Sequence, residues 1–138
     1  MIYETEADRK KESGVFGAIS LSYSCEIEMC PPLSPADGYL IDSEGSRRAV
    51  VEVKNRRNAH NHYPTYMLSA LKHGNLMRIA TSESIPALLV VNFTDGLYAT
   101  KLKDNYQMAS GGRYDRANPK DVEQCIYIPI KEFKNICK

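Results

Sequence analysis

The chain has 138 residues, of which 43% are hydrophobic and 25% are charged, and its formal net charge is +1. These values are typical of a globular protein with one hydrophobic core. No apolar run is long enough to cross a bilayer, and the N-terminus lacks the pattern of a signal peptide. We therefore expect a single intracellular, cytoplasmic domain over residues 1–138, without membrane contact.

The four cysteines are spaced without a C-x-x-C pair: Cys25, Cys30, Cys125 and Cys137. Cys25 and Cys125 lie in apolar, strand-like segments, which favours reduced and buried thiols. A zinc site that combines cysteines with histidines is the alternative, but the ligand spacing does not match such a site.

Residues 3–20 predict a helix, because apolar residues recur at helical spacing on one face: Val15, Phe16 and Ile19. Glu12 falls in line with this apolar stripe and is the best candidate for a carboxylate beside a metal, with Glu6 in reserve. An ordinary boundary glutamate is the competing interpretation. Residues 23–30 then alternate as a half-exposed strand, which Pro31 and Pro32 end.

Two strands joined by a hairpin follow, over residues 37–42 and 49–54. With period two, Val50, Glu52 and Lys54 point to one face of the second strand. Charged groups on an apolar strand are costly to bury unless they are paired or bind a metal. The hairpin returns Asp37 beside Glu52, which predicts a divalent-metal site with a lysine next to it. An exposed cross-strand ion pair is the simpler alternative.

Basic residues gather around this hairpin and the turn after it: Arg47, Arg48, Lys54, Arg56 and Arg57. A basic patch next to acidic metal ligands suits an enzyme that holds phosphate and activates water. Judged alone, the patch is equally compatible with a solvated basic loop.

A second helix is predicted to begin near Pro64 and to end near Ser82, with Lys72 on its polar edge. Residues 87–93 predict a buried central strand and residues 97–102 its hairpin partner.

Residues 103–123 predict a loop, whose Arg113, Tyr114 and Arg116 are compatible with nucleic-acid contact or with plain solvation. Residues 125–130 predict an edge strand, and residues 131–136 a short terminal helix or tail.

The order helix, three strands, helix, strand resembles the core of the PD-(D/E)xK nuclease superfamily, which includes restriction enzymes, lambda-type exonuclease and archaeal Holliday-junction resolvases. The resemblance rests on Pro35-Ala36-Asp37, on Glu52-Val53-Lys54 and on a helix glutamate such as Glu12. Similarity to small phage-type nucleases comes from three further segments: Glu52 to Arg56, Tyr63-Pro64-Thr65, and Ser69 to Lys72. One departure is Ala36, which separates the proline from Asp37.

The resemblance implies an α/β fold with a restriction-endonuclease-like αβββαβ core over about residues 3–102, and a mixed central sheet flanked by helices. It also implies that Asp37 and Glu52 ligate Mg²⁺ or Mn²⁺, helped by the carbonyl of Val53 and by Glu12. The catalytic set would be Asp37, Glu52 and Lys54, in which Lys54 orients or deprotonates the attacking water, or stabilises the phosphorane.

Under the same resemblance, Arg56, Arg57 and Lys72 would hold phosphates and Tyr63 would help to position the nucleic acid. The implied function is metal-dependent hydrolysis of phosphodiester bonds in duplex or branched DNA, with endonuclease and exonuclease action both open. A homodimer is the expected assembly, since symmetric oligomers are common. The alternatives are a catalytically inactive nucleic-acid-binding or assembly protein on the same fold, and a small metal-binding or structural domain.

Overall fold

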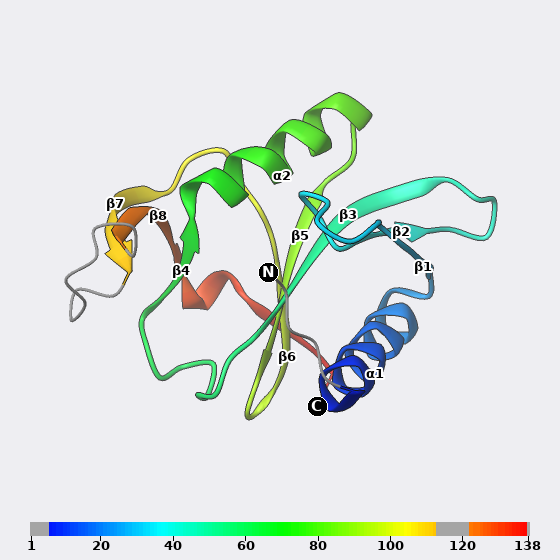
Figure 1. The fold of residues 1–138 in the computed structure, drawn as a ribbon, viewed down its shortest axis with the longest axis horizontal. Coiled ribbons are helices and arrows are strands. Elements are labelled where there is room, and N and C mark those ends of the chain that lie inside the picture. Colours follow the sequence, from blue (N-terminus) through cyan, green and yellow to red (C-terminus); the bar gives the residue numbers. More distant parts are fainter. Residues whose placement is uncertain (1–5, 113–121, 138) are drawn as a thin grey trace.

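A computed structural model describes residues 6–112 and 122–137, and the side chains of residues 14–110 and 123–136. Its helices and strands follow in this order (Figure 1): α1 Glu6–Tyr23, β1 Glu26–Met29, β2 Gly38–Ile41, β3 Arg47–Asn55, β4 Thr65–Ser69, α2 Ala70–Glu83, β5 Ala87–Phe93, β6 Gly96–Lys101, β7 Gln107–Gly112, β8 Val122–Pro129, the 3₁₀ helix Ile130–Glu132, and β9 Lys134–Cys137. No helix in this part of the chain is long and apolar enough to span a membrane.

The main sheet has six strands in the order β1-β2-β3-β5-β6-β9. Strands β3 and β5 pair in parallel, with α2 on the connection between them, and the neighbouring pairs are antiparallel. The sheet is therefore mixed, as predicted, and β3 lies in its interior. Residues 49–52 in the middle of β3 are buried.

The two helices cover opposite faces of this sheet (Figure 1). On the α1 face, Val15, Phe16 and Ile19 are buried in one cluster with Val51 and Val90. The cluster on the α2 face is larger and has Leu76 of the helix at its centre: Val50, Leu76, Leu89, Val91, Ile126 and Ile128 are fully buried there. The predicted apolar stripe of the first helix is confirmed, as is the strand at residues 87–93.

A second, three-stranded sheet in the order β4-β8-β7 corrects the prediction that the second helix begins near Pro64. Residues 65–69 form β4, and α2 begins only at Ala70. Tyr66 and Leu68 are buried whereas Met67 is exposed, which is the period-two pattern of a strand. Antiparallel pairing with β8 satisfies the backbone hydrogen-bonding groups of residues 65–69, which a helix would otherwise have satisfied.

The C-terminal predictions also need correction. Part of the predicted loop is a strand, β7, and the predicted edge strand, β8, lies in the centre of the second sheet, between β4 and β7. The predicted terminal helix is a 3₁₀ turn followed by β9, which pairs with β6 at the edge of the main sheet. Arg113, Tyr114 and Arg116 lie outside the described residues.

Three of the cysteines are free thiols, which confirms the prediction of reduced cysteines for Cys25, Cys30 and Cys125. Cys125 is buried, as predicted, whereas Cys25 is only partly buried. Burial raises the pKa of the Cys125 thiol, and the nearby Glu123 raises it further. This thiol is accordingly held in its neutral form.

The start of α2 can be tested at its N-cap, because the Ser69 side chain accepts a hydrogen bond from the Lys72 amide at 3.3 Å. We expect Ser69→Ala to destabilise the protein by about 1 kcal/mol, the usual cost of losing such a cap. The matched control is Ser82→Ala, an exposed serine in the last turn of the same helix. Thermal unfolding checks the prediction, and equal melting temperatures of the two variants would contradict it.

Candidate active site

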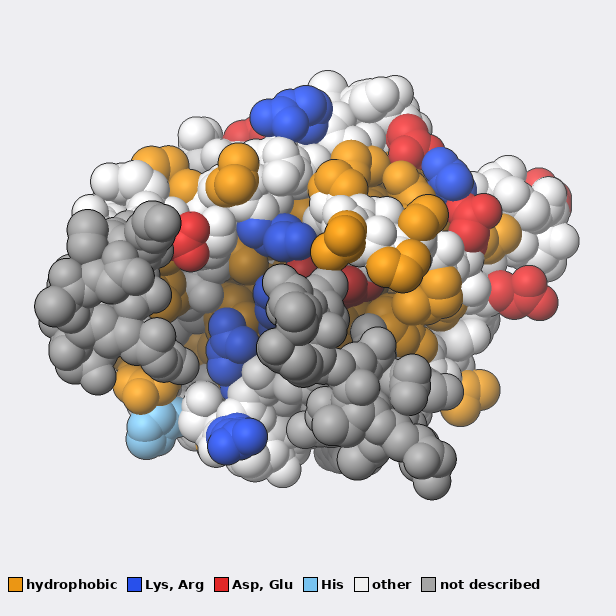
Figure 2. Space-filling model, viewed as in Figure 1, with side chains coloured by type: hydrophobic (Ala, Val, Ile, Leu, Met, Phe, Trp, Pro, Cys, Tyr) orange, Lys and Arg blue, Asp and Glu red, His pale blue; other side chains and the backbone are white. Residues whose placement is uncertain are grey.

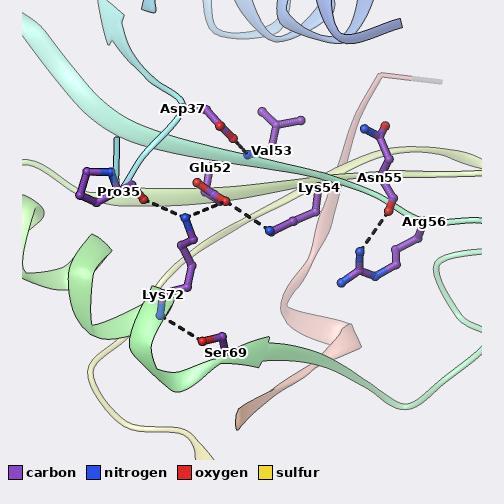
Figure 3. A network of polar contacts seen from close by, with 9 residues as sticks. All are labelled: Pro35, Asp37, Glu52, Val53, Lys54, Asn55, Arg56, Ser69 and Lys72. Atoms are coloured by element: carbon purple, nitrogen blue, oxygen red, sulfur yellow. Dashed lines mark hydrogen bonds and ion pairs between the residues drawn. The ribbon is translucent and has the colours of Figure 1, made fainter. Parts of the chain in front are cut away.

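Strand β3 directs Glu52 and Lys54 to the same face of the main sheet. Val50 packs in the cluster under α2 and Val51 in the cluster under α1, so the alternation predicted from sequence is observed. Glu52 follows Val50 on the α2 face, and its carboxylate and the Lys54 ammonium are drawn side by side in Figure 3. The interior position of β3 explains why a glutamate on this strand is buried.

The Glu52 side chain is only 4% exposed and is held between two lysines. Its Oε2 atom lies 3.5 Å from Lys54 Nζ and 3.4 Å from Lys72 Nζ. Burial raises the pKa of Glu52, and the negative charge of Asp37 raises it further, while the two lysines lower it. The net direction is upward, so the two lysines do not fully compensate the buried charge.

Asp37 reaches this site from the loop before β2. The backbone of Asp37 is fixed by hydrogen bonds to Val51 and Cys30, at 3.1 and 2.9 Å. The next residue is Gly38, where a Cβ would lie 2.8 Å from the Glu28 carbonyl oxygen, so only glycine lets β1 approach this closely. The Asp37 carboxylate ends at the edge of β3, where its Oδ2 accepts the Val53 amide at 2.7 Å (Figure 3). The structure thus brings Asp37 and Glu52 together.

The Val53 carbonyl faces the same edge of β3 as the Asp37 carboxylate. In an extended strand the N–H and C=O of one residue point to the same side, and the Val53 N–H points to Asp37. The pairing of β2 with β3 ends at Gly38 and Val51, before this carbonyl. The Val53 oxygen is therefore placed beside two carboxylates, which is the ligand chemistry that hard divalent cations prefer.

One buried atom supports a cation at this position. Glu52 Oε1 is buried, and nothing in the described part of the chain donates a hydrogen bond to it. A buried carboxylate oxygen without a partner is costly, and a divalent cation would remove that cost. Within residues 14–110 and 123–136, no three acidic, histidine or cysteine side chains are grouped so that they could hold a metal ion. Glu12 and Glu6 lie on α1, but their side chains are outside the described set.

Lys72 belongs to the first turn of α2 and contacts both strand β3 and the loop before β2. Besides its contact with Glu52, its ammonium donates to the Pro35 carbonyl at 3.0 Å (Figure 3). This lysine was predicted as a phosphate ligand on a polar helix edge, and the structure places it against the acidic pair itself. The late start of α2 decides this position, because Lys72 lies only three residues after the cap at Ser69.

The other predicted nucleic-acid contacts lie beyond Lys54, where β3 ends. Arg56 donates to the Asn55 carbonyl at 3.0 Å and lies over the Tyr66 ring, 4.7 Å from its centroid. Arg57 is exposed, and Tyr63 is 59% exposed. Figure 2 shows Lys and Arg side chains in a row that runs from the middle of this face towards its lower edge, beside acidic side chains that lie deeper. A strand of nucleic acid could follow such a row.

Sequence reasoning missed Tyr66, a buried tyrosine between Arg56 and the acidic pair. Burial raises the pKa of Tyr66 to about 12, with Arg56 lowering it and Glu52 raising it. The period-two pattern from Tyr66 to Leu68 could have identified the strand. It was hidden because the following residues continue an apolar pattern at helical spacing.

Comparison with protein families now decides where the chain belongs. Residues 1–136 match the family described as "Phage putative PDDEXK endonuclease". The chain belongs to this family. The membership confirms the resemblance to PD-(D/E)xK proteins. A comparison with curated proteins finds no match.

The fold of this PDDEXK family member is similar to that of a solved structure, Hjc, a Holliday junction resolvase of the archaeal hyperthermophile Archaeoglobus fulgidus. The TM-score is 0.55 at 13% sequence identity, over 93% of this chain and 95% of that one. At this identity the likeness concerns the fold alone. It confirms the predicted restriction-endonuclease-like α/β architecture.

Proposed function

We propose that this PDDEXK protein is a nuclease that hydrolyses phosphodiester bonds in DNA with Mg²⁺ or Mn²⁺. Family membership supports nuclease chemistry. The observation that carries the metal-dependent proposal is the buried Glu52 carboxylate, which has one oxygen without a partner and lies beside Asp37. Two acidic groups close together beside an interior strand are costly to keep together.

In this proposal Asp37, Glu52 and the Val53 carbonyl hold the cation, with Glu12 of α1 as a further ligand. When bound, such an ion lowers the pKa of a coordinated water and neutralises charge on the phosphate. Lys54 then orients or deprotonates the water, or stabilises the charge that develops on the phosphorus oxygens. Its ammonium lies 3.5 Å from the Glu52 carboxylate, and so beside the proposed cation site.

The remaining basic residues would bind the DNA backbone. Lys72 reaches the acidic pair from α2 and would contact the scissile phosphate, while Arg56 and Arg57 would hold phosphates further along the strand. Tyr63 at the surface would help to position the nucleic acid. Symmetric assembly as a homodimer stays a prediction from the sequence.

The function is tested by incubating the purified protein with plasmid, linear duplex, single-stranded and four-way DNA in Mg²⁺, Mn²⁺ or EDTA. We expect cleavage with either metal and none in EDTA. The product pattern on these substrates separates endonuclease from exonuclease action. Salt-sensitive DNA binding without cleavage in any metal would contradict the proposal in favour of an inactive binding protein. Neither binding nor cleavage would favour a structural domain.

The proposed backbone contacts predict a specific change in salt dependence. We expect Arg57→Ala to weaken DNA binding in EDTA several-fold, and to reduce the slope of log K against log[salt] by about 1. Arg78→Ala removes an exposed arginine on the outer surface of α2 and is the matched control. Fluorescence anisotropy at several salt concentrations measures both slopes. An unchanged slope in Arg57→Ala would show that this side chain does not neutralise a phosphate.

A further inference from the structure

An aromatic pocket of about 390 Å³ opens beyond the end of β3. Its volume is within the range of pockets that hold small molecules. Nearly half of its lining residues carry aromatic rings, and one carries a guanidinium: His60, Tyr63, Tyr66, Phe93, Tyr127 and Arg56. The proposed cleavage site uses none of these rings as a ligand or a base, so the pocket needs its own explanation.

The pocket lies next to the end of the strand that carries Glu52 and Lys54. Arg56 lines it and comes directly after the end of β3, two residues after Lys54, with its guanidinium over the Tyr66 ring. The charge of Glu52 also acts on the Tyr66 hydroxyl. A nucleotide next to a phosphate bound at Lys54 would therefore lie near the mouth of the pocket.

The Tyr66 hydroxyl is the strongest sign of a ligand. Tyr66 is 5% exposed, and within residues 14–110 and 123–136 no group hydrogen-bonds its oxygen. Leaving a buried hydroxyl without a partner is unfavourable, and a polar group of a ligand would satisfy it. The base edges of nucleotides carry such donors and acceptors.

Another part of the pocket lining is already fixed in place. His60 Nδ1 lies 2.5 Å from Asp95 Oδ2, and the His60 amide donates to the other oxygen of Asp95 at 2.9 Å. The hydrogen bond from His60 lowers the pKa of Asp95. The His60 ring also stacks on Tyr98, with 4.2 Å between the centroids. A ring held in this way is ready to contact a planar ligand without further ordering.

Tyr63 supplies an exposed aromatic surface at the rim. It is 59% exposed, and its ring meets His62 edge-on at 4.5 Å between centroids. Exposed rings beside basic side chains are the elements with which proteins bind unstacked bases. The combination differs from a duplex-binding surface, which needs only backbone contacts.

We infer that this pocket binds one unpaired nucleobase of the DNA strand that lies across Arg56 and Lys54. The inference rests on the proposed function and narrows its substrate to DNA with unpaired nucleotides, such as bulges, branch points and single-strand junctions. A base within an intact duplex is stacked and paired, and must be extruded before it can enter a pocket. The ring of the base would stack against the aromatic walls, and its edge would bond the Tyr66 hydroxyl.

The test measures affinity in EDTA for a fully paired duplex and for the same duplex with one unpaired nucleotide at its centre. We expect the wild type to bind the second DNA at least about 10-fold more tightly, a preference typical of one base–aromatic stack. In Tyr63→Ala the preference should fall to about 1. Tyr63→Phe should restore it. Tyr66→Phe should weaken binding of the unpaired base without lowering the melting temperature.

Leu21→Ala is the control, since Leu21 is 84% exposed on α1, which covers the opposite face of the main sheet. It should retain the wild-type preference. Equal affinity of the wild type for both DNAs, or a full preference in Tyr63→Ala, would overturn the inference. Competition by a free deoxynucleoside monophosphate at micromolar concentration would overturn it too, because the pocket would then bind a free nucleotide.

Cleavage assays in Mg²⁺ with the same DNAs keep the two proposals separate. Cleavage without any preference for the unpaired nucleotide would overturn the pocket assignment and leave the nuclease proposal standing. A preference that depends on Tyr63, without cleavage of any DNA, would support the pocket and contradict the nuclease proposal.

Discussion

Replacing Lys54 by alanine should lower the rate of DNA cleavage by roughly 10²–10⁴-fold, the usual contribution of a positioned acid–base group. Asp37→Asn should cost at least about 10³-fold, because it removes a metal ligand worth several kcal/mol and each 1.36 kcal/mol is tenfold. Both variants should stay folded and retain most DNA binding, since neither side chain belongs to a hydrophobic cluster. Single-turnover cleavage in Mg²⁺ measures the effect.

The control for Lys54→Ala is Lys101→Ala, which removes an exposed lysine from β6. Its cleavage rate should equal that of the wild type. Melting temperatures and DNA affinities of all three variants separate loss of chemistry from loss of structure. Cleavage by Lys54→Ala or Asp37→Asn at the wild-type rate would show that the site is assigned wrongly.

A second large effect is expected on stability, because the buried Glu52 carboxylate lacks a partner for one oxygen. Mg²⁺ or Mn²⁺ should raise the melting temperature by several degrees. A ligand at 100 times its Kd adds roughly 2.7 kcal/mol, and a domain of this size gains a few degrees per kcal/mol. Ca²⁺ can be included as a cation that binds carboxylates in a similar way. Scanning calorimetry with and without each metal measures the shift.

The same carboxylate predicts how stability depends on pH. The pKa of Glu52 in the folded protein is raised above its ordinary value of 4.5, mainly by burial. Its contribution to stability is therefore present below that ordinary value and is lost as the pH rises through the raised pKa. Without metal, the protein should lose this contribution on going to neutral pH. The metal-induced shift should be larger at neutral pH than near pH 4.5, where a larger fraction of Glu52 is protonated.

Glu52→Gln tests both statements, because the amide keeps the shape of the protonated acid. Without metal at neutral pH, this variant should melt at or above the temperature of the wild type, and added Mg²⁺ should leave its melting temperature unchanged. Glu123→Gln, an exposed change on β8, is the control and should behave as the wild type. A metal shift of wild-type size in Glu52→Gln would contradict the proposed ligand role.

Much of the main sheet follows from local pattern. Residues 87–93 form a continuous apolar run, and the structure has a strand with the same bounds. In β3 the alternation of Val50, Val51 and Glu52 assigns each side chain to the correct face. Sequence patterns of this kind are reliable because the period of a strand is a property of the backbone itself.

Other segments were predicted wrongly because their structure depends on a distant partner. Residues 65–69 have an apolar pattern that continues into a true helix, yet they pair with β8, some sixty residues later. The edge strand β9 likewise exists through its pairing with β6. Propensity within such short segments is weak, and contacts with other strands override it.

The sequence by itself determined the chemistry: an aspartate, a glutamate and a lysine at fixed spacing on a hairpin, with basic residues next to them. Only the tertiary structure decided how these groups are used. The interior position of β3 buries Glu52, and the β4 strand starts α2 late enough to bring Lys72 against it. Strand β4 also places Tyr66 in the lining of the aromatic pocket. Spacing along the chain is covalent and readable, whereas burial and long-range pairing arise only when distant segments pack together.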